Sequence, residues 1–165
     1  MSQNEIADFY GHDHDLLDEY FQKFKQLKAT DFDQAKEYFK KFKFGLKRHI
    51  AWEEEILFPL FDEKFGSNGC SPTVQMKEEH RKIEKALENL HEKIRVRDIQ
   101  SVSQENDLYI LLREHNDKEE MIVYPAVDRA SSEAEQRAVF KKMEELPVEK
   151  YKTCCMVPLD DHKKH

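Results

Sequence analysis

Residues 49–59 read HIAWEEEILFP and residues 115–125 read HNDKEEMIVYP, so one pattern recurs after 66 residues. Each copy begins with a histidine, has a glutamate four residues later, and ends in an aromatic residue followed by proline. On an α-helix, residues i and i+4 lie one turn apart on the same face. Each copy therefore presents an imidazole beside a carboxylate.

The apolar residues around each copy predict that both pairs face the protein core. The helical stripe of His49 and Glu53 also contains Phe42, Leu46, Ile56 and Leu60. The stripe of His115 and Glu119 also contains Leu108, Leu112, Ile122 and Ala126. Polar groups in an apolar core are costly unless something satisfies them. Two equivalent inward pairs therefore favour a shared metal over two surface ion pairs, each worth about a few tenths of a kcal/mol.

The composition bounds the class of protein. A chain of 165 residues is long enough for one domain with a sizeable core. A net charge of −7 disfavours nucleic acid as a partner, and no apolar run reaches the ~20 residues of a membrane helix. The segment Met1–Glu5 lacks the basic and apolar regions of a secretory signal. Three cysteines (Cys70, Cys154 and Cys155) have no disulfide-framework spacing, so we expect a cytoplasmic protein.

Few glycines and a hydrophobic period near 3.6 predict an all-α chain. The expected helices, with a kink or interruption near Pro59, cover about residues 6–28, 32–64, 72–94, 105–129 and 131–145. Short connections favour an up-down-up-down antiparallel four-helix bundle with a short extra C-terminal helix. We expect one domain over residues 1–145 and a tail over residues 146–165.

In such a bundle the second and fourth helices sit diagonally and run in the same direction, so their repeated faces meet in the core. The first and third helices each add a histidine on the core stripe, His14 and His80. His12 competes with His14, but only His14 shares the stripe of Leu17 and Phe21. The candidate metal ligands are His14, His49, Glu53, His80, His115 and Glu119. Glu54 and Glu120 lie about 100° round the helix from this face and are expected outside the ligand set.

Six nitrogen and oxygen ligands are too many for one tetrahedral ion. They suit two ions with the glutamates bridging between them. Imidazole with carboxylate fits iron well and manganese acceptably, whereas structural zinc usually closes with four ligands. Two ions held in this way keep coordination positions for solvent, an oxo bridge or dioxygen.

In these motifs the chain resembles the hemerythrin-like family, also called the HHE cation-binding domain. The resemblance covers about residues 8–130 and rests on Asp13-His14-Asp15-Leu16-Leu17, His49-x3-Glu53 leading to Phe58-Pro59, Glu79-His80, and His115-x3-Glu119 leading to Tyr124-Pro125. It implies a four-helix bundle around a non-haem di-iron centre with oxo and carboxylate bridges. The family's roles include oxygen binding or sensing, nitric oxide handling, iron sensing and repair of iron–sulfur clusters.

The chain departs from the oxygen carriers of this family at two places. They have a second histidine one turn from the first on the third helix, where this chain has Met76 and Glu84 around His80, and they end in His-x4-Asp. Four histidines and two glutamates are more similar to bacterial iron-centre repair proteins, whose N-terminal paired cysteines are absent here. We expect two non-haem irons that bind or sense dioxygen or nitric oxide. The alternatives are a di-iron redox enzyme, a cluster-repair or iron-donor factor, and a metal-free helical interaction module.

Overall fold

The computed structural model describes residues 4–66 and 69–152, and these residues form helices and no β-strand. The α-helices are α1 (Glu5–Leu27), α2 (Phe32–Trp52), α3 (Phe58–Phe65), α4 (Pro72–Arg95), α5 (Val102–Lys118), α6 (Tyr124–Ala130) and α7 (Glu133–Glu145). Two π-helical segments, η1 (Glu53–Leu57) and η2 (Glu119–Val123), and a short 3-10 helix, η3 (Val148–Lys150), complete the described part. The all-α prediction is confirmed.

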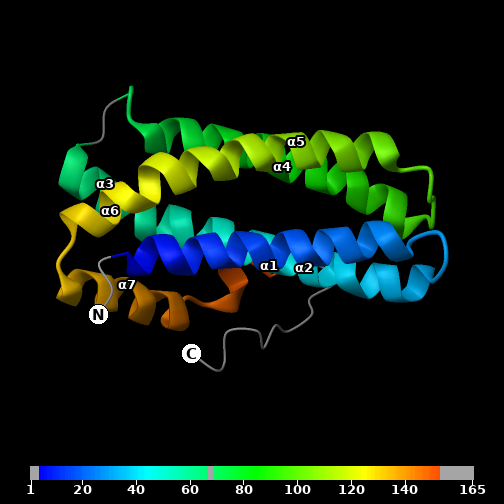
Figure 1. The fold of residues 1–165 in the computed structure, drawn as a ribbon, viewed down its shortest axis with the longest axis horizontal. Coiled ribbons are helices and arrows are strands. Elements are labelled where there is room, and N and C mark those ends of the chain that lie inside the picture. The colour runs from blue at the N-terminus through cyan, green and yellow to red at the C-terminus, as the bar shows by residue number, and fades with distance from the viewer. Residues whose placement is uncertain (1–3, 67–68, 153–165) are drawn as a thin grey trace.

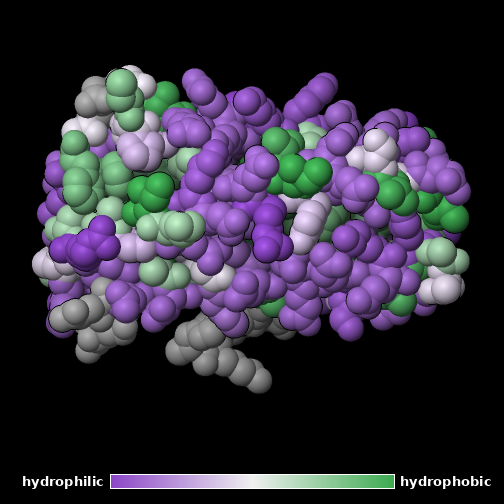
Figure 2. Space-filling model, turned by 45° about the horizontal axis from the view of Figure 1, so that its top comes forward, coloured by the Kyte–Doolittle hydropathy of each residue, from purple (hydrophilic) through white to green (hydrophobic). Residues whose placement is uncertain are grey.

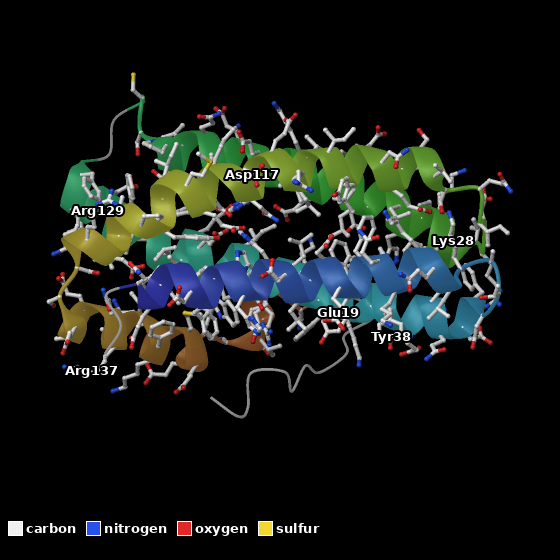
Figure 3. All side chains as sticks on the ribbon, in the orientation of Figure 1. Glu19, Lys28, Tyr38, Asp117, Arg129 and Arg137 are labelled. Carbon is white, nitrogen blue, oxygen red and sulfur yellow. The ribbon has the colours of Figure 1, made fainter. Side chains whose placement is uncertain are left out.

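The long helices α1, α2, α4 and α5 run along the long axis of the molecule (Figure 1). The chain reverses direction at the turn after α1 and again at the turn after α4 (Figure 1). Helix α1 packs on α2, and α4 packs on α5. Side chains fill the space between these two layers (Figure 3). Helix α6 contacts α1, and α7 contacts η1, at the end of the bundle where α1 begins (Figure 1).

Helix starts follow the capping residues in the sequence. The Asp31 side chain accepts a hydrogen bond from the Gln34 N–H at the start of α2. Ser71 caps α4, and Pro72 occupies its first position, where a missing N–H costs no helical hydrogen bond. Ser132 and Glu135 form a reciprocal capping box at the start of α7.

Both repeats leave the α-helix at the glutamate and continue as π-helix. The Phe58 N–H bonds the Glu53 carbonyl, and the Tyr124 N–H bonds the Glu119 carbonyl, five residues back in each case. The proline that follows each aromatic residue has no N–H to donate to the regular ladder. The predicted interruption near Pro59 therefore begins earlier, at Glu53.

The π-helical segment corrects one prediction from the α-helical stripe. Ile122 was expected in the core but is 54% exposed, whereas the next residue, Val123, is 1% exposed. A π-helix winds more residues into each turn, so the inward position moves one residue along the chain. The equivalent Ile56 stays buried in the first copy, where α7 packs against η1.

Two apolar clusters divide the interior along the bundle axis. One contains Leu17, Phe21, Phe42 and Leu87, and the other contains residues from both ends of the chain, such as Tyr10 and Met143. On α1, α4 and α5 the predicted histidine falls between residues of the two clusters, and on α2 His49 lies close to the boundary between them. The outer face in Figure 2 is mostly hydrophilic, with small separate hydrophobic patches. Within the described residues no helix combines the length and the apolar character needed to span a membrane.

Candidate metal centre

The structure brings the six predicted residues together in two buried groups. The first group is His14, His49, Glu53 and Glu119, and the second group is His80, His115, Glu53 and Glu119. Within each group the donor atoms lie within 4.8 Å of one another. His14 faces this centre from α1, whereas its competitor His12 is exposed.

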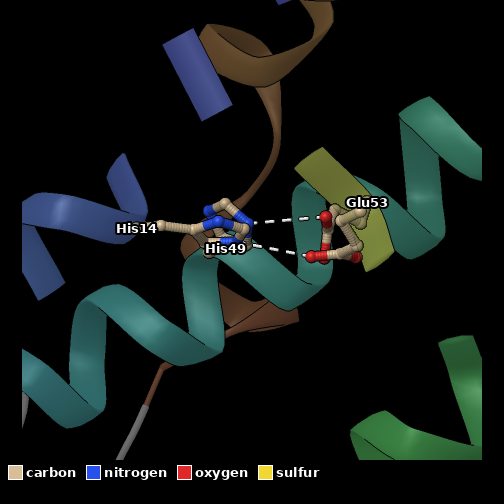
Figure 4. A group of neighbouring side chains, drawn as sticks. His14, His49 and Glu53 are labelled. Carbon is tan, nitrogen blue, oxygen red and sulfur yellow. Dashed lines mark ion pairs between the residues drawn. The ribbon is translucent and has the colours of Figure 1, made fainter. Parts of the chain in front are cut away.

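Each of the two glutamates belongs to both groups and divides its oxygens between them. Glu53 Oε2 lies 3.4 Å from His49 Nε2, and Glu53 Oε1 lies 3.1 Å from His80 Nε2. Glu119 Oε1 lies 3.3 Å from His14 Nε2, and Glu119 Oε2 lies 3.1 Å from His115 Nε2. Figure 4 shows the imidazoles of His14 and His49 turned toward Glu53. Donors at right angles on one ion, at bonds of ~2.1 Å, lie ~3 Å apart, close to these separations.

In each of the four candidate histidines, the outer nitrogen, Nδ1, lies within hydrogen-bond distance of a carboxylate from another helix. The pairs are Asp13–His49 at 2.8 Å, Glu54–His80 at 2.6 Å, Glu79–His115 at 2.9 Å and Glu120–His14 at 2.8 Å. These contacts form a closed ring that runs from α1 to α2, from η1 to α4, from α4 to α5 and from η2 back to α1. Such partners hold each ring with Nε2 directed inward.

The buried charges shift the pKa values of the centre in opposite directions. Burial raises the pKa of Glu53, but the charge of His49 and the hydrogen bonds that Glu53 makes hold it well below its ordinary value. Burial lowers the pKa of His49, but Glu53 and Asp13 raise it well above its ordinary value. Burial likewise lowers the pKa of His80, yet hydrogen bonds to Glu53 and Glu54 raise it to about 9. In the metal-free protein, protons on His49 and His80 therefore offset the charge of Glu53.

Three buried donor atoms of the second group indicate that this group could bind a cation. Glu53 Oε1, His80 Nε2 and Glu119 Oε2 are buried, and none of them makes a hydrogen bond of regular geometry within the described part of the chain, although Glu53 Oε1 and His80 Nε2 lie 3.1 Å apart as an ion pair. Leaving a buried polar atom unsatisfied costs ~1–3 kcal/mol. Since all three atoms face the same point and are nitrogen or carboxylate donors, a bound cation would satisfy them together.

Tyr124 is a residue of this centre that sequence reasoning did not assign to it. Its side chain is fully buried, and its hydroxyl donates to Glu53 Oε2 at 2.6 Å. Burial, followed by the charges of Glu119 and Glu53, raises the Tyr124 pKa well above its ordinary value. The signal was present in the repeat, because Tyr124 occupies the position of Phe58 and adds a hydroxyl.

A partly open cavity of about 260 Å³ lies beside His14, between α1, α2 and α5. Its apolar lining residues are Leu17, Phe21, Phe42, Leu46 and Leu112. Charged residues, including Asp18 and Arg113, also line it. His14 lines the cavity too, so the cavity adjoins the edge of the first group.

Within the part of the chain that the structure describes, cysteine supplies no donor to either group. Cys70 is exposed, and Cys154 and Cys155 lie outside the described residues. The six candidate residues therefore offer only imidazole nitrogen and carboxylate oxygen.

Comparison with known proteins agrees with the motifs. The family model for the hemerythrin HHE cation binding domain matches residues 5–127. An uncharacterized hemerythrin-like protein of Schizosaccharomyces pombe is 26% identical over 130 residues, or 79% of this chain. The aligned region spans 63% of the length of that relative. No solved structure matches the chain.

Proposed function

The chain belongs to the hemerythrin HHE cation-binding domain family, and from that premise we propose that it is a non-haem di-iron protein that binds or senses dioxygen or nitric oxide. In this proposal His14, His49, His80 and His115 are terminal ligands, and Glu53 and Glu119 bridge the two ions. The observation that carries it is the division of each carboxylate between the two histidine pairs. A single ion would need only one oxygen from each glutamate.

The donor set favours iron among the metals that such a site can hold. Imidazole and carboxylate suit iron, and manganese acceptably, while the absence of sulfur among six donors argues against a closed structural zinc site. Bound iron supplies the redox chemistry and the open coordination positions that a diatomic ligand requires. The protein positions the imidazoles through the ring of carboxylates at their Nδ1 atoms.

The cavity beside His14 supports a small, weakly polar ligand. Its volume of about 260 Å³ exceeds the ~30 Å³ that one water occupies in the liquid, and its wall combines apolar side chains with polar and charged ones. Leu17, Phe21 and Leu112 would limit the access of water to the centre. The remaining coordination positions would then be available to dioxygen or nitric oxide.

The proposed architecture is an up-down-up-down four-helix bundle over residues 1–145, followed by a C-terminal tail over residues 146–165. The first part of this tail lies against α2, where the ring of Tyr151 is 5.5 Å from that of Phe44. A cytoplasmic location stays a prediction from the cysteine usage.

The first experiment measures the metal content of untagged protein together with its optical spectrum in air. Two irons per chain, and oxo-to-iron bands in the near ultraviolet that shift with azide, are expected. Absence of stoichiometric metal after anaerobic ferrous reconstitution would contradict the proposal and favour a helical interaction module. Reduction of dioxygen, peroxide or nitric oxide with turnover by an electron donor would instead identify an enzyme.

A second experiment tests the cavity as the ligand route. Leu112→Phe adds bulk to the lining and is expected to slow azide binding without changing the iron content. Ile110→Phe is the matched control, because Ile110 is on the same helix and is 55% exposed. Equal azide binding rates in both variants would exclude this route.

A further inference from the structure

The two repeats differ at the residue that follows each π-helical segment. Phe58 and Tyr124 occupy equivalent positions, are fully buried, and donate their N–H groups to Glu53 and Glu119 in the same way. The Phe58 ring stacks on His80, with centroids 5.7 Å apart and planes 12° apart. Tyr124 brings a hydroxyl to the other half of the centre, so the chemical symmetry of the repeat is broken there.

The Tyr124 hydroxyl lies in the middle of the first group. Its oxygen is 3.2 Å from His14 Nε2, 3.1 Å from His49 Nε2, 2.6 Å from Glu53 Oε2 and 3.0 Å from Glu119 Oε1. A hydroxyl has one proton and two lone pairs, so it can serve three hydrogen-bond partners but not four. An ion held by the first group would have to share this space with the phenol oxygen.

The ring of Tyr124 has little room to withdraw from an ion. It is fully buried, its centroid lies 5.1 Å from that of Tyr10, and it lies 5.7 Å from that of His14. Protein interiors are close-packed, so a swing of this ring would require neighbouring core side chains to move. A shift that brings the oxygen into the coordination shell needs much less rearrangement.

We propose that the Tyr124 oxygen is a fifth protein ligand of the ion held by His14, His49, Glu53 and Glu119, an inference that rests on the di-iron function proposed above. On ligation the oxygen–hydrogen bond is replaced by an oxygen–metal bond, and the proton leaves to solvent. The centre is then asymmetric, because the first ion has five protein ligands and the second, beside Phe58, has four. The ion with fewer protein ligands keeps more positions for an external molecule.

The test compares the visible spectra of the full chain and two tyrosine variants, each loaded anaerobically with ferrous iron and oxidised by air. A phenolate ligand gives ferric iron a charge-transfer band in the visible, and this band is expected to disappear in Tyr124→Phe while both irons are retained. Tyr10→Phe is the matched control, because Tyr10 is also fully buried and its hydroxyl contacts Met143 Sδ at 3.4 Å, outside the two groups. It is expected to keep the band.

The outcomes separate this inference from the proposed function. Two irons per chain without a visible phenolate band, or a band that survives in Tyr124→Phe, would overturn ligation by Tyr124 and leave the di-iron proposal standing. Absence of iron from the unaltered protein would overturn both. If Tyr124→Phe does not fold, resonance Raman spectra of the unaltered protein and of Tyr10→Phe replace it, because ring modes of a coordinated phenolate appear only when tyrosine is a ligand. Absence of these modes would overturn the inference, and their presence in both proteins would support Tyr124, whose hydroxyl contacts the candidate ligands.

Discussion

Asp13 and Glu120 each hydrogen-bond a histidine of the first group, so replacing them measures how much such a carboxylate contributes to metal affinity. Asp13 holds His49 and Glu120 holds His14, both with an oxygen 2.8 Å from Nδ1, and both histidines belong to the first group. The two carboxylates differ in exposure, since the Asp13 side chain is 1% exposed and the Glu120 side chain is 45% exposed. Asp13→Asn and Glu120→Gln each keep the shape of the side chain and remove its charge.

The size of each effect follows from this difference in exposure. Loss of a carboxylate behind a metal-binding histidine typically costs 10–100-fold in affinity, which corresponds to about 1.4–2.8 kcal/mol. Water screens the charge of Glu120 but not that of the buried Asp13. We therefore expect Asp13→Asn to weaken metal binding about 100-fold and Glu120→Gln about 10-fold or less.

Competition between each variant and a chromophoric chelator for ferrous iron, under anaerobic conditions, measures these affinities. Glu19→Gln is the control, because Glu19 is exposed on α1 (Figure 3) and should leave the affinity unchanged. An equal loss in Asp13→Asn and Glu120→Gln, or a greater loss in Glu120→Gln, would refute the argument from screening. An unchanged affinity in Asp13→Asn would show that the charge behind His49 has no role in binding.

Three further predictions concern the shared glutamates, the protonated histidines and the core. Glu119→Gln should lower the metal content at both ion positions, whereas His80→Ala should leave roughly one ion per chain. Metal analysis measures both variants, and an equal loss of metal in the two would contradict the sharing of Glu119 between the groups. The chelated protein should lose stability as the pH rises from 6.5 to about 9, because the pKa of His80 is raised in the fold. The proton on His80 therefore contributes its full stabilisation only below the unfolded value of 6.5, and this contribution is lost as the pH rises through about 9. Thermal unfolding across this range should show that trend in chelated protein and a weaker one in iron-loaded protein. Phe42→Ala should cost about 3–5 kcal/mol in urea unfolding, and Phe65→Ala, at a half-exposed site, within ~0.5 kcal/mol.

The helices and the facing of the candidate residues could be read from the sequence, because both follow from local periodicity. The stripe that contains Leu17 and Phe21 placed His14 inward, and the repeat placed Glu53 and Glu119 at equivalent points. That these residues bind iron stays a prediction. The sequence thus predicted which side chains of a single helix face the core.

The contacts between helices could not be read in the same way. Asp13 and Glu79 each precede a histidine in the chain, yet each holds a histidine of another helix. These pairings depend on how far neighbouring helices are offset and rotated, which periodicity does not specify. The prediction that Ile122 lies in the core was wrong for a different reason. It assumed α-helical winding through a segment that is π-helical.

The shared glutamates also bear on how such a centre can diverge between descendants. A change at a histidine alters the donors of one half, but a change at Glu53 or Glu119 alters both halves together. Lineages that drift toward a single-ion site are therefore expected to lose His14 with His49, or His80 with His115, and to retain both acidic positions. Glu53 and Glu119 would then be retained in relatives that have lost one pair of histidines.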